Sequence, residues 1–218
     1  GNENACLTLP DAIPEPQPAT ADRLLGAHYF PGWQPGVHRG WSVLEDFPER
    51  TPLLGYYDES DPDVTDWQIK WALEHGIGFF LYCWYRKKEN AGNPIAPGDL
   101  HLGHALHEGL FRCRFAEQFK FAIMWENQGQ RAMIASFDDL RDNMVPFWCD
   151  HYFSKPYYLR VDGNPLLFVY HLDSLIEQTG GEEGARRALN IIRKGVADRG
   201  LGGAVRQAHP EGLDGAGH

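Results

Sequence analysis

The chain has 218 residues, of which 43% are hydrophobic, and this is enough to bury the core of one globular domain. Its formal net charge of -10 argues against nucleic acid or an anionic membrane surface as the main partner, because both bind basic proteins. No run of apolar residues predicts membrane insertion.

The first 22 residues predict an extended, proline-rich leader rather than a part of the core. Four prolines lie within residues 1–20, among small and acidic residues. Such a segment is typical of the region directly after a cleaved signal peptide, so we expect an extracellular or periplasmic protein. Residues 23–218 are then expected to form a single folded domain.

Apolar runs bounded by polar residues predict four buried strands and the start of a fifth, at residues 25–30, 77–85, 121–125, 166–170 and 202–205. Helical spacing of apolar residues separates them, within residues 61–76, 102–115, 136–148 and 185–196. Pro146 is expected to kink or interrupt the third helix, because proline lacks the backbone N–H that a helix interior uses. Residues 158–163 predict a short hairpin arm.

Alternation of buried strands and helices is typical of an α/β protein with a parallel sheet. A doubly wound sheet and a (β/α)8 TIM-type barrel both fit this order. No GxGxxG motif follows the first strand, which weakens the dinucleotide-binding version of the doubly wound sheet. We therefore favour a barrel. About five strands are visible, so it is expected to be incomplete at its C-terminus, as the N-terminal two thirds of a barrel.

Polar and aromatic residues gather where the predicted strands end, which is the face that carries the active site in barrel enzymes. Glu126 is the candidate catalytic residue, because it places a carboxylate directly after the indole of Trp125. The candidate substrate-binding residues are Tyr29, Trp33, Tyr57, Trp84, Tyr85, Trp125, Asn127, Tyr170 and His171. The four cysteines lack the spacing of a zinc site, and we expect neither a metal nor a cofactor.

Several segments, in order, resemble the glycoside hydrolase family 99-like group, which includes the WbsX-like proteins of polysaccharide gene clusters. They lie between about residues 25 and 175 and include His28-Tyr-Phe-Pro-Gly-Trp33, Gly55-Tyr-Tyr-Asp58, Gly76-Ile-Gly-Phe-Phe-Leu-Tyr-Cys-Trp-Tyr85, Phe119-Lys-Phe-Ala-Ile-Met-Trp-Glu-Asn127 and Tyr158-Leu-Arg-Val-Asp-Gly-Asn-Pro165. The resemblance implies a (β/α)8 barrel that acts on a glycan or polysaccharide. It also implies that Glu126 corresponds to the carboxylate that deprotonates the sugar 2-hydroxyl in the family's endo-mannosidases.

The sequence departs from the family pattern in two respects. Many relatives have Trp-Ala-Asn where this chain has Trp125-Glu126-Asn127, and no second carboxylate follows Glu126 closely. Glycoside cleavage normally uses two carboxyl groups about 5–10 Å apart. The partner acid comes from another loop, comes from a C-terminal part that is absent here, or does not exist.

Three hypotheses account for these observations. The first is a glycoside hydrolase that uses Glu126. The second is an inactive or glycosyltransferase-associated barrel that binds glycans. The third is a structural or assembly protein that is built on a partial barrel and self-associates to cover its open sheet edges.

Overall fold

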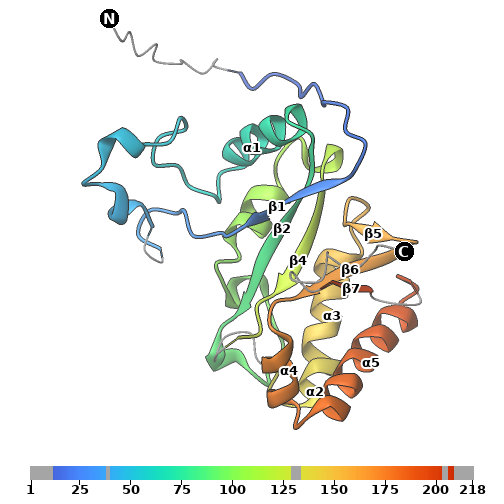
Figure 1. The fold of residues 1–218 in the computed structure, drawn as a ribbon. Coiled ribbons are helices and arrows are strands. Elements are labelled where there is room, and N and C mark those ends of the chain that lie inside the picture. The colour runs from blue at the N-terminus through green and yellow to red at the C-terminus, as the bar shows by residue number, and fades with distance from the viewer. Residues whose placement is uncertain (1–11, 38–39, 129–133, 203–205, 209–218) are drawn as a thin grey trace, which may run out of the picture.

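The fold is seen in a computed structural model, which describes residues 12–37, 40–128, 134–202 and 206–208 (Figure 1). Its centre is a parallel sheet of five strands, which are β1 (Leu25–Tyr29), β2 (Ile77–Arg86), β4 (Lys120–Trp125), β6 (Asn164–Val169) and β7 (Arg206–Ala208). Two short strands pair antiparallel to this sheet, β3 (Leu100–His101) with β2 and β5 (Arg160–Val161) with β6. The hairpin arm predicted at residues 158–163 corresponds to β5 and its turn.

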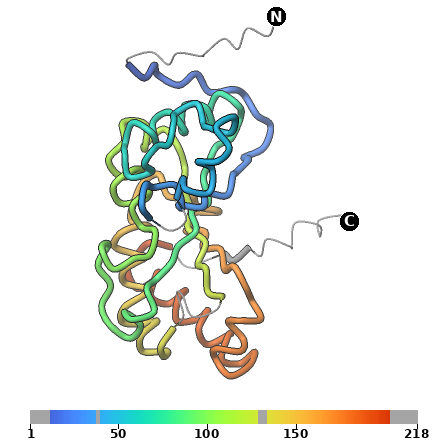
Figure 2. The backbone as a smooth tube through the Cα atoms, turned by 90° about the vertical axis from the view of Figure 1, so that its left-hand side faces the viewer, coloured from blue at the N-terminus to red at the C-terminus, as the bar shows by residue number. Residues whose placement is uncertain are grey.

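The five parallel strands follow one another in chain order from β1 to β7. A doubly wound sheet reverses its strand order at a switch point, and this sheet does not reverse among the described strands. The barrel-type fold predicted from the sequence is therefore confirmed, as an open sheet. The blue N-terminal elements and the red C-terminal elements lie at opposite ends of the molecule (Figures 1 and 2). Residues 203–205 of the predicted fifth strand lie outside the described residues, and β7 begins at Arg206.

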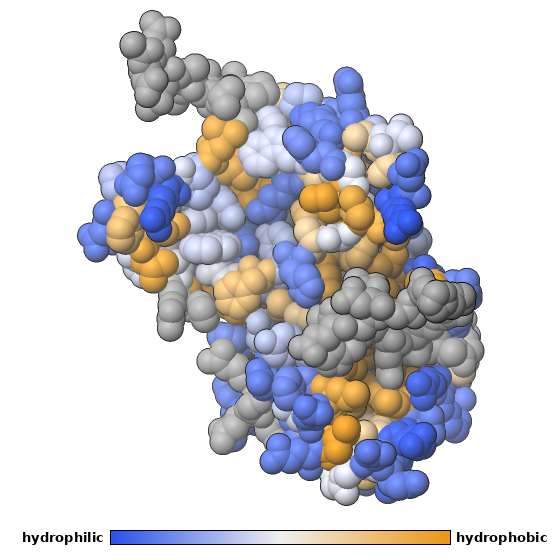
Figure 3. All heavy atoms as spheres, viewed as in Figure 1, coloured by the Kyte–Doolittle hydropathy of each residue, from blue (hydrophilic) through white to orange (hydrophobic). Residues whose placement is uncertain are grey.

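The two faces of the sheet differ in burial. One face packs under the helices and carries Tyr29, Phe80, Tyr82, Trp84, Phe121, Ile123, Trp125, Leu167 and Val169, all of them buried. On the opposite face many side chains are half-buried or exposed, among them Phe30, Phe79, Cys83, Tyr85, Glu126, Phe168 and Tyr170. In a closed barrel this second face is the interior. In the view of Figure 3, apolar patches lie between hydrophilic areas of the surface.

Helix α1 (Pro62–Glu74) forms as the sequence predicts. The Asp61 side chain accepts a hydrogen bond from the Asp63 N–H, and Pro62 occupies the first helical position. Gly76 has a φ of 78° just after the helix, a conformation that glycine adopts without strain. The later helices α4 (Leu172–Gln178) and α5 (Glu182–Asp198) follow β6, and α5 packs Ala188, Ile192 and Val196 into the core.

The regular α-helical pattern is interrupted next to Pro146, as the sequence predicts. The helical segment continues as α2 (Phe137–Asp139), a π-helical turn at Leu140–Met144, α3 (Val145–Trp148) and a second π-helical turn at Cys149–Phe153. Because α3 begins anew after a π-helical turn, Pro146 lies in the first turn of α3, where no backbone N–H is required. The sequence periodicity cannot show this change of hydrogen-bonding pattern.

Shorter helical turns fill the loops between the strands. They are 3-10 turns at Gly40–Leu44, Pro48–Arg50, Lys88–Asn90, Pro97–Asp99 and Ala116–Gln118, and a π-helical turn at Ala105–Leu110. None of the helices in the described part of the chain has the length and apolar character that a membrane span requires.

The N-terminal segment is extended from residue 12 onward, but it packs on the domain that comes after it. The Ala19 N–H donates to the carbonyl of Leu73 at 2.9 Å, and Ile13 packs against the core. Glu15 accepts hydrogen bonds from Arg114 and from Gln118. Described residues of the expected leader thus contact α1 and the turn before β4.

Candidate functional site

The strand ends place Glu126 in a row of aromatic side chains on the open face. Trp84, Trp125 and Val169 are aligned in neighbouring strands, so the next residue of each strand falls on the opposite face. These next residues are Tyr85, Glu126 and Tyr170. The Glu126 N–H donates to the carbonyl of Trp84 at 3.1 Å, and the Tyr170 N–H donates to the carbonyl of Trp125 at 3.0 Å. Glu126 therefore lies between Tyr85 and Tyr170, with its backbone fixed.

Phe30 extends this row on the side of β1. Its ring meets that of Tyr85 edge to face, with 6.4 Å between the centroids. The exposed fraction is 43% for Phe30 and 39% for Tyr170, and Glu126 is half-buried. Phe30 was not among the predicted site residues. Strand alternation contains the signal, because a residue that follows the core-facing Tyr29 must point to the other face.

Cys83 lies two residues before Tyr85 on the same face of β2. Burial raises the pKa of the Cys83 thiol, a hydrogen bond from Tyr85 opposes this shift, and the Glu126 carboxylate raises the pKa further. The thiol is therefore protonated at neutral pH and is a poor nucleophile.

Asn127 and His171 are joined by a pair of hydrogen bonds. The Asn127 side-chain amide donates to the His171 carbonyl at 2.7 Å and accepts from the His171 N–H at 2.9 Å. The Asn127 carbonyl accepts a hydrogen bond from Gln178 of α4 at 2.7 Å. The exposed fraction of Asn127 is 0%, so this side chain lies inside the protein and not on the open face.

Three other predicted contact residues point into the core beneath the helices. Tyr29 donates to Gln68 of α1 at 2.8 Å, and its ring stacks on that of Tyr82. Trp84 and Trp125 are buried against Trp148, with ring centroids 5.3 and 5.4 Å away. Packing accounts for all three side chains, whereas their predicted role in substrate contact is untested.

Trp33 and Tyr57 belong to a second aromatic group, in the loop between β1 and α1. Trp41 is its centre, stacked on Trp33 at 4.5 Å and meeting Tyr57 edge to face at 4.7 Å between centroids. The Trp41 indole N–H donates to the carbonyl of Tyr57. Tyr57 has its pKa raised to about 12, first by burial and then by the Glu59 carboxylate. This group lies in the loop that follows β1.

Glu59 is a buried carboxylate that the sequence did not single out. Its exposed fraction is 1%, it accepts a hydrogen bond from the Trp33 N–H at 2.8 Å, and its carboxylate lies 3.6 Å from Nε2 of His104. The Glu59 N–H donates back to the Trp33 carbonyl. These contacts connect the segment around Trp33 to the segment around Glu59. In the sequence, the only indication that Glu59 matters is its position directly after Tyr56, Tyr57 and Asp58.

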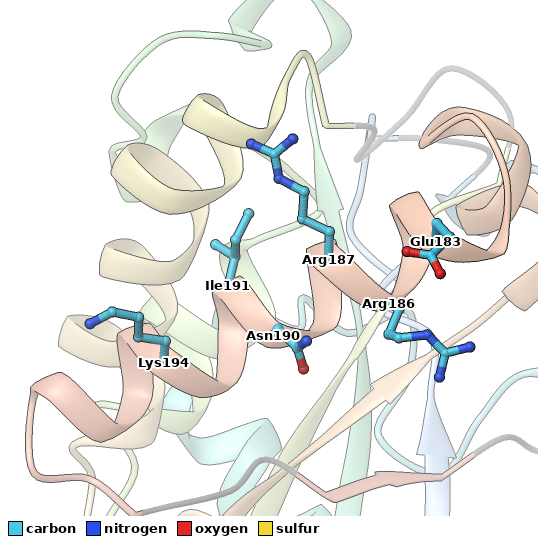
Figure 4. A pocket seen from close by; sticks show the side chains of 6 residues that line it. All are labelled: Glu183, Arg186, Arg187, Asn190, Ile191 and Lys194. Carbon is cyan, nitrogen blue, oxygen red and sulfur yellow. The ribbon is translucent and has the colours of Figure 1, made fainter.

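A hollow of about 340 Å³ lies on the surface of α5, and its position excludes it as the strand-end site. Figure 4 shows that all six lining residues belong to this one helix, namely Glu183, Arg186, Arg187, Asn190, Ile191 and Lys194. Within the described residues, no group of three or more His, Cys, Asp or Glu side chains is arranged to hold a metal ion.

Comparisons with known proteins give a family for the sequence. A family model described as glycosyltransferase WbsX matches residues 46–204, well over half of the chain. Two curated relatives, each named uncharacterized protein WxcX, come from strains of Xanthomonas campestris pv. campestris and are 29% identical over 226 residues. The match covers 93% of this chain but only 30% of each relative, so the chain spans less than a third of their length.

Two solved structures of a GH99 endo-alpha-mannosidase from Bacteroides thetaiotaomicron, one in complex with BIS-TRIS-Propane, are also similar. Each is 21% identical with a TM-score of 0.45, and the match covers 69% of this chain. It covers 42% of one of those chains and 46% of the other.

Proposed function

Because the chain belongs to the family described as glycosyltransferase WbsX, we propose that its strand-end face binds a glycan. We further propose that the chain acts as a glycoside hydrolase in which Glu126 is the catalytic carboxylate. The position of Glu126 at the C-terminal end of β4, on the interior-type face and between two tyrosines, supports this proposal.

The row around Glu126 has the chemistry that a sugar requires. The aromatic faces of Phe30, Tyr85 and Tyr170 offer apolar area to the C–H faces of a sugar ring, and the tyrosine hydroxyls can bond to its polar groups. A carboxylate between them lies where it can accept a proton from a sugar hydroxyl or donate one to a leaving oxygen.

The second carboxyl group that glycoside cleavage normally needs is not in the described row, where Phe30, Tyr85 and Tyr170 flank Glu126. Glu59 does not supply it, since its side chain is buried and bonded to Trp33. We propose that the partner acid comes from residues other than the described ones. The much greater length of the curated relatives is compatible with this source.

The family description favours a second candidate, a glycosyltransferase. The two activities differ in their co-substrate, because a hydrolase needs only water, whereas a transferase consumes an activated sugar donor. Incubation of the native polypeptide with mannans and bacterial polysaccharides separates them. Release of new reducing ends without a donor supports the hydrolase, and chain extension only when nucleotide sugars are added supports the transferase.

The role of Glu126 is tested by Glu126→Gln, which keeps the shape of the side chain and removes its acid–base function. We expect the rate of reducing-end release to fall by about a thousandfold or more. Glu117→Gln is the matched control, because this exposed residue precedes β4 and lies at the other end of the strand. A Glu126→Gln variant with the full wild-type rate excludes Glu126 as the catalytic residue.

A further inference from the structure

Asn127 follows Glu126 directly, and its side chain acts as an additional rung of the sheet. The regular pairing of β4 with β6 ends at Trp125 and Val169. One step beyond, the Asn127 amide takes the place of a peptide group and bonds to both the N–H and the carbonyl of His171. The Asn127 carbonyl also accepts from Gln178, so both groups of its side-chain amide and its carbonyl are engaged inside the protein.

His171 is fixed in a defined hydrogen-bonding state as well as in position. Its Nδ1 accepts a hydrogen bond from the Ser174 N–H at 3.1 Å and lies 2.9 Å from the Ser174 hydroxyl oxygen. A ring nitrogen that accepts a backbone N–H carries no proton, so neutral His171 holds its proton on Nε2. The imidazole therefore presents an N–H donor to whatever lies beyond Nε2.

We propose that Asn127 is a positioning residue that sets His171, as an Nε2–H donor, at a fixed place relative to the Glu126 carboxylate. This inference rests on the proposed function for its catalytic consequence, but its structural part is independent of it. Asn127 itself contacts no substrate, because its side chain is buried and both groups of its amide are bonded to His171. It acts through its neighbours, by holding the loop after β4 against the loop after β6.

The geometry also predicts what each neighbour contributes. Glu126 is adjacent to the bridge and has its own N–H bonded to Trp84, so its backbone is held on both sides. His171 is held by Asn127 through its backbone and by Ser174 through its ring. Loss of the Asn127 amide removes the bonds between the end of β4 and the end of β6. The side chains of Glu126 and His171 are then still present, but they are displaced. Displacements of about 1 Å between catalytic groups cost up to about a hundredfold in rate.

The first test is a spectroscopic one and needs no substrate. Nitrogen-15 NMR of the imidazoles in the native polypeptide is expected to show His171 with a protonated Nε2 and an unprotonated, hydrogen-bonded Nδ1. Comparison with the His171→Gln variant identifies which imidazole signals belong to His171, because these signals disappear in the variant. Asn127→Asp keeps the size of the side chain but turns an oxygen toward the His171 carbonyl, and we expect it to shift the His171 signals. Asn190→Asp on the exposed face of α5 is the matched control and leaves them unchanged.

The second test uses glycan cleavage, where it is present. Asn127→Asp is expected to lower kcat about tenfold or more with a smaller change in KM, because substrate contacts remain while the catalytic groups are displaced. Glu126→Gln removes activity and leaves the His171 spectrum as in the wild type. Absence of all glycan cleavage thus contradicts the proposed function alone. A wild-type His171 protonated on Nδ1, or His171 signals that Asn127→Asp does not shift, contradicts the positioning role.

Should Asn127→Asp fail to fold, Gln178→Leu provides a milder change, since it removes only the bond to the Asn127 carbonyl. We expect it to shift the His171 signals in the same direction by a smaller amount. An unchanged spectrum in a folded Gln178→Leu protein also contradicts the proposal.

Discussion

At the scale of single residues, the half-buried His107 contacts the buried Tyr152. Tyr152 accepts a hydrogen bond from the Trp84 indole at 3.0 Å, and its hydroxyl lies 2.9 Å from Nε2 of His107. The Tyr152 hydroxyl can donate to His107 only when Nε2 of His107 is unprotonated. Burial, and then the neighbouring His151 and Lys155, lower the pKa of His107 to about 4.

This pKa predicts an acid-sensitive fold. Between about pH 6.5 and pH 4 the unfolded chain binds a proton at His107 that the folded chain does not, so stability falls as the pH is lowered through this window. The loss between pH 7 and pH 5 is on the order of 2 kcal/mol. Urea unfolding at the two pH values should show it, and His107→Gln should reduce it. His75→Gln, at an exposed histidine, should leave it unchanged.

Gly109 illustrates a residue whose identity is set by the space around it. A Cβ atom at this position would lie 2.5 Å from the carbonyl oxygen of Glu59 and 2.8 Å from the Thr65 hydroxyl oxygen. Backbone cannot move aside cheaply, so the turn at Ala105–Leu110 approaches the Glu59 loop only because residue 109 is glycine.

Gly109→Ala is therefore expected to destabilise the protein by about 1–3 kcal/mol. Gly98→Ala is the control, because a Cβ there meets nothing within 4 Å and its backbone is not in the left-handed region. Thermal unfolding of the two variants measures the difference. Equal melting temperatures would show that the turn moves away from Glu59 at no cost.

At the scale of elements, a buried ion pair joins the last residue of β2 to the last residue of α2. Arg86 donates to both carboxylate oxygens of Asp139, at 2.7 and 3.0 Å, and also to the carbonyls of Asn90 and Asn93. Burial alone would raise the pKa of Asp139, but the hydrogen bonds from Arg86 and from the Ala135 N–H outweigh it, and the pKa is lowered. The pair joins the loop after β2 to the segment that leads into α2.

Removal of one partner leaves the other charge buried without compensation. Asp139→Ala is expected to cost about 3–5 kcal/mol of unfolding free energy. Asp138→Ala, which breaks only an exposed ion pair with Arg141, is expected to cost about 1 kcal/mol or less. Chemical denaturation compares the two neighbouring positions directly. A similar, small cost at both positions would mean that the Arg86 contact contributes little.

At the scale of the whole molecule, the open sheet leaves an edge strand with apolar residues in solvent. Leu24 and Leu25 at the start of β1 are more than half exposed. Exposed apolar edges of this kind associate with other chains.

Three expectations from the sequence stay predictions. They are self-association, an extracellular or periplasmic location, and the boundary at residue 22 between the leader and the folded domain.

We expect the 218-residue polypeptide to associate with rising concentration, and Leu25→Lys to weaken the association. Leu53→Lys is the control, because this residue is similarly exposed but lies in the loop before α1. Analytical ultracentrifugation across a range of concentrations measures both. A monomer at every concentration tested would exclude self-association through the sheet edge.

The sequence by itself determined the order of strands and helices, the barrel-type class and the family resemblance. These features depend on local patterns, such as the apolar run from Phe121 to Trp125 and the capping of α1 by Asp61, and local patterns are readable along one chain. It also selected Glu126, Tyr85 and Tyr170, which the register of β2, β4 and β6 brings into one row.

Only the tertiary structure decided which strand-end residues face the helices and which face the open side. Trp84 and Trp125 are aromatic like Tyr85, and Asn127 is polar like Glu126, yet Trp84, Trp125 and Asn127 are buried. Strand register and long-range hydrogen bonds, such as that from Asn127 to His171, set the direction of these side chains. The Glu59–Trp33 contact depends likewise on a partner far along the chain, and the π-helical turn before Pro146 depends on how the helix forms its hydrogen bonds. Composition and spacing contain no record of such contacts, since they arise only when distant segments pack together.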